Sequence, residues 1–355
     1  MRYGFVFLSA ALAATLAGGP SPIAAQEVSV ATSPETSGAG TAKLAFTKDG
    51  RLLHEIQSVS AAAWGEFGHV RAITYDTRTG KIIHLLTLGP DTWFFSATSD
   101  GRTAIISIDR DRKDARAHLL LVDMETGQAQ DIPSKWFDAD DHNPYAQISG
   151  DGRLVSAYTE SNAEIGRIVT LYEWRTKKLI AKQSAGYPAG GGAWGGVTQD
   201  GEIEFLNSRT GGDIVDPKSG RLLVTIGLNS HRSLDGAWII EFPNPLFGDA
   251  PREVIIENRS GEVAGKLDLQ MTDDELYKTW RGAFCGRSAR FIAASADTVR
   301  AFEIPSGKKI ADFPKTTWQD PDATKTDPTP TVACSFNGKR VAIRSGVRLT
   351  LHDLN

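Results

Sequence analysis

The side chains that could most readily bind a metal ion form one acidic stretch, Asp138-Ala139-Asp140-Asp141-His142-Asn143. Calcium binds several oxygen ligands, and the carboxylates of Asp138, Asp140 and Asp141 could supply them. The stretch lacks the glycine and the distal glutamate of an EF-hand loop. We therefore predict a solvated acidic loop, with a calcium site as the alternative.

No catalytic motif accompanies this loop. The seven histidines show no metal-ligand spacing, and no Gly-x-Ser-x-Gly elbow surrounds a serine. We therefore expect no cofactor and no catalytic residue, and we favour a binding protein over an enzyme. Because an active site assembled from distant segments leaves no local motif, a hydrolase remains the alternative.

The two cysteines, Cys285 and Cys334, occupy similar places in successive repeats of the sequence, each a few residues ahead of a turn position. If successive repeats form neighbouring sheets of a ring, and both cysteines lie on the innermost strands of their sheets, the two side chains come close around the axis of the ring. Outside the cytoplasm a disulfide would then form. The alternative is two separate buried thiols.

An internal repeat must position all of these side chains. An acidic residue recurs at intervals of 41 to 50 residues, at Asp76, Asp123, Glu173, Asp216, Glu257, Glu303 and Asp353. A serine or threonine follows three residues after each of the first six, and a glycine comes next in five of them. This pattern fits a turn whose carboxylate accepts hydrogen bonds from the turn amides and hydroxyl. We interpret these carboxylates as structural.

A second mark lies about half a repeat earlier. Hairpin-turn dipeptides occur at Asp49-Gly50, Asp100-Gly101, Asp151-Gly152, Asp200-Gly201, Asp235-Gly236 and Asn337-Gly338, with Ser288-Ala289 as a degenerate copy. Between the marks lie short runs rich in Val, Ile, Leu and aromatic residues, as strands require. The unit therefore predicts four antiparallel strands, and seven units predict an all-β, seven-bladed β-propeller.

The last unit has only three strands. Glu27–Thr32 alternates like a strand ahead of the first unit, so we predict that it completes the last blade and closes the ring. This divides the chain into residues 1–25 as a signal peptide, 26–43 as the closing strand and linker, and 44–355 as the propeller.

Tryptophans gather in the segments that connect the blades, at Trp93, Trp136, Trp194, Trp280 and Trp318. Trp64 and His69 fall in a loop of blade one that opens on the same face. Rigid aromatic side chains dominate binding interfaces, so this face is the predicted binding surface. The alternative is that these rings pack between the blades as spacers.

Three other segments have irregular composition. Residues 190–196 are glycine-rich but lack the strand and helix of a phosphate loop, so we expect them to let the chain pass close to the channel. Lys315–Pro330 is predicted to be a surface excursion. Thr272 is predicted to cap a short helix.

The first 25 residues resemble an export signal. Arg2 precedes an apolar run, Phe5–Leu16, which is too short to span a membrane. We expect cleavage after Ala25, a periplasmic location and no transmembrane segment. The formal net charge of −4 disfavours a nucleic-acid partner. We also expect a monomer.

The repeats resemble the bacterial WD40-like and YVTN-like propellers, with the Trp-Asp dipeptide relaxed to Tyr75-Asp76, Val122-Asp123, Val215-Asp216 and His352-Asp353. The resemblance covers the chain after residue 25. The motif is specific for the fold and nearly silent on activity, since the same scaffold serves binding proteins and a few enzymes. We favour a scaffold that holds a protein partner or an envelope component, with a lactonase-like hydrolase as the alternative.

Overall fold

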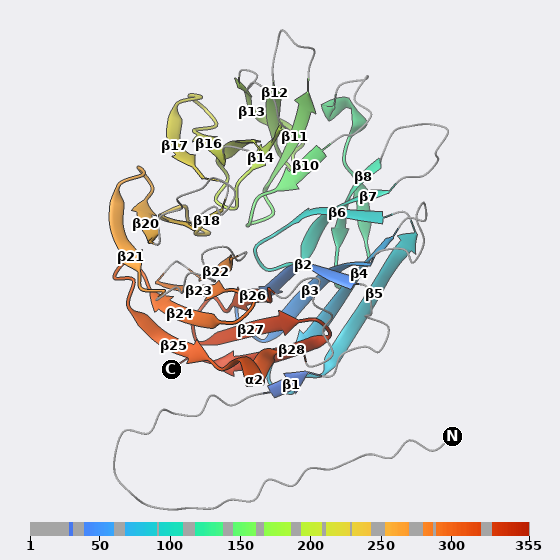
Figure 1. Ribbon diagram of the computed structural model, residues 1–355. Coiled ribbons are helices and arrows are strands. Elements are labelled where there is room, and N and C mark those ends of the chain that lie inside the picture. The colour runs from blue at the N-terminus through green and yellow to red at the C-terminus, as the bar shows by residue number, and fades with distance from the viewer. Residues whose placement is uncertain are drawn as a thin grey trace, which may run out of the picture.

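The computed structural model describes a ring of small antiparallel sheets around a central axis (Figure 1). The described residues are 28–30, 39–59, 68–90, 92–108, 118–137, 145–160, 167–185, 193–207, 211–227, 229–242, 253–269, 280–286, 289–320 and 329–354. Seven sheets are present in these ranges, which confirms the all-β, seven-bladed β-propeller.

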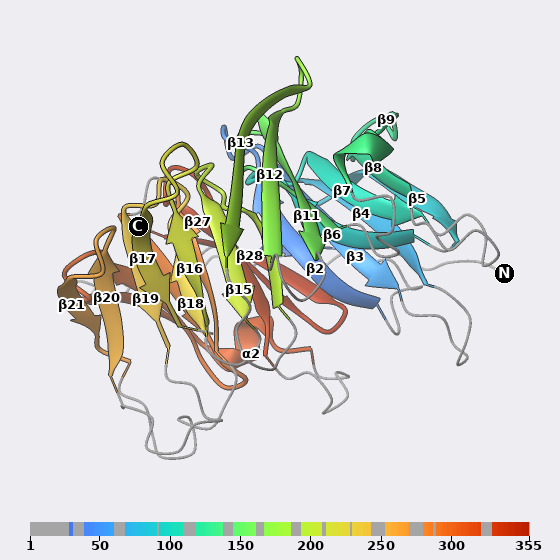
Figure 2. The same cartoon turned by 90° about the horizontal axis from the view of Figure 1, so that it is seen from above.

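Each of the first six blades consists of four strands that follow one another in the chain, from the inside outward. Blade one contains β2 (Ala39–Phe46), β3 (Leu52–Val59), β4 (His69–Asp76) and β5 (Ile82–Pro90). Blade two contains β6 (Thr92–Ala97), β7 (Thr103–Ile108), β8 (His118–Asp123) and β9 (Ala129–Asp131). Blade three contains β10 (Tyr145–Ile148), β11 (Leu154–Glu160), β12 (Arg167–Glu173) and β13 (Lys178–Ala185). Blade four contains β14 (Ala193–Val197), β15 (Ile203–Asn207), β16 (Gly211–Val215) and β17 (Leu222–Ile226). Blade five contains β18 (Ser230–Arg232), β19 (Trp238–Glu241), β20 (Val254–Asn258) and β21 (Val263–Leu267). Blade six contains β22 (Arg281–Cys285), β23 (Arg290–Ala294), β24 (Val299–Glu303) and β25 (Lys309–Phe313). Figure 2 shows the turn between β12 and β13 standing out beyond the neighbouring blades.

Blade seven contains β26 (Thr331–Cys334), β27 (Arg340–Ser345) and β28 (Arg348–Asp353). The backbone of β1 (Val28–Val30) lies antiparallel beside β28, with Val28 opposite Leu351 and Val30 opposite Leu349. That this short segment holds the ring closed stays a prediction. The predicted signal peptide, residues 1–25, lies outside the described residues.

The Asp-Gly turns join the first and second strands of a blade, as predicted. In blade one, Asp49 Oδ1 accepts hydrogen bonds from Thr47 Oγ1 at 2.7 Å and from the Arg51 amide at 3.1 Å, and Gly50 has φ +70°. The positive φ explains why glycine is needed there. The same Ser/Thr-to-Asp/Asn bond recurs at Thr98, Ser149, Thr198, Ser233 and Ser335. The degenerate copy cannot be compared, because Ser288 lies outside the described residues.

The acidic turns join the third and fourth strands. Asp76 Oδ1 accepts from the Thr79 hydroxyl at 2.8 Å and from the Thr79 amide at 2.7 Å, and these bonds lower the pKa of Asp76. Lys177, which replaces glycine in the third copy, has φ +57°. These contacts support a structural role for the carboxylates.

One copy of this motif was assigned one residue too early. In blade five, Asn258 rather than Glu257 caps the turn, because Asn258 Oδ1 accepts from the amides of Ser260 and Glu262. Glu257 belongs to β20, where burial raises the pKa of its carboxyl and the neighbouring Glu241 adds to the effect.

Two short helical turns were not predicted. They are η1 (Ser134–Trp136) and α2 (Lys315–Trp318). The prediction of a surface excursion beginning at Lys315 is therefore wrong for its first residues, since α2 buries Trp318 completely. The helix predicted after Thr272 lies outside the described residues.

The blades pack face to face, and each of the seven seams between neighbours contains one cluster of buried apolar side chains. Between blades six and seven, Cys285 of β22 and Cys334 of β26 are joined by a disulfide. Equivalent positions on adjacent inner strands are thus close enough to bond, as the repeat had suggested.

Candidate functional site

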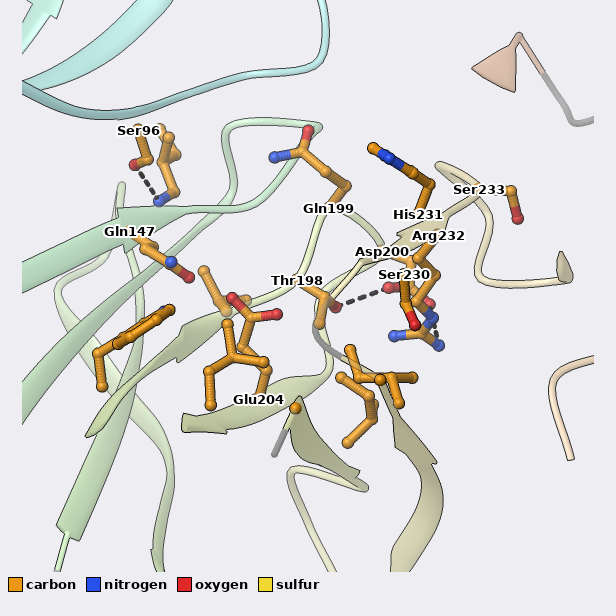
Figure 3. A pocket seen from close by; sticks show the side chains of 18 residues that line it. Ser96, Gln147, Thr198, Gln199, Asp200, Glu204, Ser230, His231, Arg232 and Ser233 are labelled. Carbon is orange, nitrogen blue, oxygen red and sulfur yellow. Dashed lines mark hydrogen bonds and ion pairs between the residues drawn. The ribbon is translucent and has the colours of Figure 1, made fainter. Parts of the chain in front are cut away.

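A cavity of about 340 Å³ opens at the seam between blades four and five (Figure 3). Its wall follows blade four from Trp194, near the start of β14, to the turn at Thr198 and Asp200. Blade five contributes β18 and Ser233, while Ser96 of β6 and Gln147 of β10 complete the inner side. Four blades therefore contribute to one hollow beside the channel.

Two features of the sequence leave this space open. The apolar cluster of the seam has only three fully buried members among the described residues, Ile214, Val224 and Ile239. Gly195 and Gly196 of β14 also lack side chains where blade three approaches: a Cβ on Gly196 would overlap the Gln147 side chain. Gly196 therefore admits Gln147 to the cavity wall, while Gly195 approaches Val169 and Tyr158 of blade three. Residues 190–192 of the glycine-rich segment lie outside the described residues.

An ionic cluster forms one side of the cavity. Arg232 Nη2 lies 3.0 Å from Asp200 Oδ2 and also contacts Glu202, and all three side chains are largely buried. Arg259, whose side chain is 56% exposed, contacts Glu202 from outside. Because two carboxylates share Arg232, its charge is fully balanced within the protein.

Two further titratable groups face the cavity. Burial raises the pKa of Glu204, opposed by its hydrogen bond with Gln147 and by Arg232, with Asp200 adding to the rise. Burial lowers the pKa of His231 to about 4, so its imidazole is neutral at pH 7. The His231 ring packs edge-on against Phe242, with 5.5 Å between centroids. At neutral pH His231 is therefore a neutral part of the wall.

Several buried polar atoms of this wall have no hydrogen-bond partner among the described residues. They are Gln147 Oε1, Gln199 Oε1, Ser230 Oγ, and Arg232 Nε and Nη1. Buried polar groups are nearly always paired in native proteins, and those that are not call for an explanation. Here they are gathered around one cavity, as a binding site requires.

The predicted aromatic face is only partly present as a surface. The Trp136 ring stacks on Tyr172 with 3.8 Å between ring centroids, and the Trp280 ring stacks on Phe242 with 5.6 Å between centroids. Trp318 Nε1 donates a hydrogen bond to the Phe313 carbonyl. These three rings are buried, as the spacer interpretation requires, because the connections fold back onto the seams.

The other predicted binding residues lie apart from one another. Trp93 is 53% exposed near the start of β6, while His69 begins β4 and is half-buried. Only Trp194 lines the cavity. Trp64 and the candidate calcium ligands Asp138, Asp140 and Asp141 lie outside the described residues. Elsewhere in the described ranges, no group of three His, Cys, Asp or Glu side chains is arranged to hold a metal.

The sequence contained a signal for this site that motif analysis missed. In blades one to three the Asp-Gly turn is followed by Arg51, Arg102 and Arg153, and in blade seven Lys339 follows Asn-Gly. In blade four Glu202 follows the Asp-Gly dipeptide, and the turn is one residue shorter than in blade one. The Thr198 amide donates to the Glu202 carbonyl, whereas in blade one the Thr47 amide donates to the carbonyl of the more distant Leu52. Blade five has Ala237 at this position, so among the turns with Asp-Gly or Asn-Gly only blade four carries an acidic residue there.

No protein-family model matches this chain, and no curated protein sequence does. Among solved structures, hydrazine synthase from Kuenenia stuttgartiensis is similar, with a TM-score of 0.49 and 14% sequence identity. The match covers 89% of this chain and 96% of that one. Finally, none of the helices in the described ranges is long and apolar enough to cross a bilayer.

Proposed function

We propose that this protein is an exported, periplasmic β-propeller that acts as a binding module for an envelope component or a protein partner. The supporting observation is the cavity between blades four and five, where buried polar atoms with no hydrogen-bond partner among the described residues surround an open space. Leaving such atoms unsatisfied costs roughly 1–3 kcal/mol each, so a ligand that pairs with them gains affinity. The same scaffold serves many functions, and the site rather than the fold carries the proposal.

Export is supported by the apolar run in the first 25 residues and by the disulfide between Cys285 and Cys334, since disulfides persist mainly outside the cytoplasm. Mass spectrometry of protein from the periplasmic fraction should find a mature chain beginning at Gln26. A chain that still begins at Met1 in the soluble cytoplasm would contradict this part of the proposal.

The binding function is tested by affinity capture from envelope extracts with the immobilised mature protein. Trp93→Ala should lose bound material if its exposed ring belongs to the binding surface. Leu222→Ala is the matched control, because Leu222 is 54% exposed but lies on the outer strand of blade four. Indistinguishable captured sets for wild type and Trp93→Ala would argue against the aromatic face.

Hydrolysis is the second candidate, and Glu204 is the residue that favours it. A buried carboxyl with a raised pKa can act as a general acid. The cavity, however, takes its carboxylates, histidine and arginine from only two blades, which gives weaker convergence than a lactonase-like site would show. Turnover of model lactones and esters that disappears in Glu204→Gln would establish this alternative.

We also propose that the strand around β1 closes the ring by completing blade seven. Its support is the antiparallel pairing of Val28–Val30 with β28, which covers a sheet edge that would otherwise be open. Deleting residues 26–32 from the mature protein should lower the melting temperature markedly. An unchanged melting temperature would remove this idea.

A further inference from the structure

We infer that the cavity between blades four and five binds a neutral polyhydroxylated ligand the size of one sugar residue, such as the terminal residue of an envelope glycan. This inference rests on the proposed binding function and names the class of ligand. It follows from the kinds of hydrogen-bonding atoms available, from their charge balance and from the shape of the wall.

The unpartnered atoms include both donors and acceptors. Gln147 Oε1 and Gln199 Oε1 can only accept, Arg232 Nε and Nη1 can only donate, and Ser230 Oγ can do either. Figure 3 shows Gln147 on one side of the cavity and Ser230 with Arg232 on the other, with Thr198 and Glu204 between them. A hydroxyl both donates and accepts, so a ligand that carries several hydroxyls can satisfy the two sides together.

The charge balance disfavours ionic ligands. Arg232, the only arginine among the described residues of the wall, is already shared by Asp200 and Glu202, which leaves no net positive charge for a phosphate or a carboxylate. Asp200 is paired with Arg232, and burial raises the pKa of Glu204, the direction that disfavours an ionic contact with an ammonium group. A neutral ligand makes the same hydrogen bonds without the cost of transferring its own charge into the protein.

The rest of the wall is apolar. Trp194 is half-buried, and Ile148, Ile214 and Ile226 line the cavity beside it. The C–H face of a pyranose ring is apolar and packs well against such a surface. A volume of about 340 Å³ lies near the small end of ligand pockets, which span roughly 300–1,000 Å³, and therefore suits one sugar residue.

Titration calorimetry on the full mature protein tests this inference with separate monosaccharides, both hexoses and N-acetylhexosamines. An amino acid and inorganic phosphate serve as the ionic probes. We expect at least one monosaccharide to bind, and Gln147→Met and Gln199→Met each to weaken it about tenfold, since methionine keeps the side-chain length and removes the acceptor. Gln130→Met is the control, because Gln130 is exposed on the outer strand β9, and it should leave the affinity unchanged.

Every other outcome contradicts either the inferred ligand class or the inferred site. Heat from phosphate or the amino acid but not from any sugar would refute the ligand class. Sugar binding that both methionine variants preserve, with melting temperatures matching wild type, would refute the site. If no probe binds, the ligand class is again wrong, while the proposed binding function is still judged separately by envelope capture, whose Trp93 variant leaves these glutamines intact.

Discussion

The seam between blades six and seven and the seam between blades four and five come from the same repeat but are filled differently. The first contains twelve buried apolar residues in the described ranges, including Trp318, and the disulfide joins its two inner strands. The second contains three, and its remaining space is divided between a cavity and the ion pairs of Arg232. One seam is thus apolar and covalently linked, and the other is polar and open.

Under the proposed binding function, this difference separates stability from ligand binding within a single architecture. Apolar burial stabilises a seam by about 25 cal/mol per Å², whereas buried ion pairs often add little net stability because both charges must be desolvated. A propeller whose stability is spread over seven seams can tolerate one weak seam. The weak one is where groups can be kept available for a ligand.

The largest test of this contrast is Trp318→Ala, which removes a fully buried ring from the seam between blades six and seven. We expect a loss of about 3–5 kcal/mol in the free energy of unfolding, measured by chemical denaturation, because the large side chain leaves a cavity. Trp93→Ala is the control and should change the same quantity by less than about 0.5 kcal/mol, since that ring is exposed. Similar losses for both variants would contradict the assignment of Trp318 to the core.

The disulfide gives the next largest effect. It closes a loop with a sequence separation of 49, for which chain entropy predicts at most about 4 kcal/mol of stabilisation. Replacing both Cys285 and Cys334 by alanine should lower the free energy of unfolding by up to that amount. Wild-type protein unfolded in the presence of a reductant should match the double variant. A midpoint of unfolding that does not respond to reductant would show that the bond adds nothing to this seam.

The blades and their turns could be predicted because turn chemistry is local. Asp49 accepts hydrogen bonds from Thr47 and Arg51, and Asp76 accepts from Thr79, so the spacing of these turn residues identifies the fold. The same regularity suggested that the two cysteines could pair, but it left two separate buried thiols as the alternative. The copy at Glu257 was misplaced because Asn258, one residue later, caps the turn equally well.

The site was much less visible in the sequence. Its lining residues Ser96, Gln147, Glu204 and Arg232 come from four blades, and only the folded ring brings them together. The burial of Trp136 and Trp280 depends on how each connection folds back onto a seam, which residue type does not reveal. Glu202, an acidic residue at the position where the turns of blades one to three carry an arginine, was the one local clue.

The open seam should also respond to acid through His231. Its pKa in the folded protein is about 4, whereas an unfolded histidine has a pKa near 6.5, so only the unfolded chain takes up this proton between those values. Stability from this group is present above about pH 6.5 and is lost as the pH falls towards 4, by up to about 3 kcal/mol. Comparing wild type with His231→Gln by denaturation at several pH values isolates this share. Parallel pH profiles would mean that His231 does not titrate in this way.

The smallest expected effect is the difference between the two seams in the cost of the same substitution. Ile292 and Ile239 are both fully buried, the first between blades six and seven and the second between blades four and five. Ile292→Ala should cost about 4 kcal/mol of unfolding free energy, because its close-packed surroundings relax little around the new void. Ile239→Ala should cost only about 2 kcal/mol, since the void it creates lies in a sparsely packed seam beside an existing cavity. The difference of about 2 kcal/mol is measurable by denaturant titration of the two variants side by side. Equal costs would mean that the seam between blades four and five is packed as firmly as its counterpart, and the contrast between an apolar seam and an open one would fail.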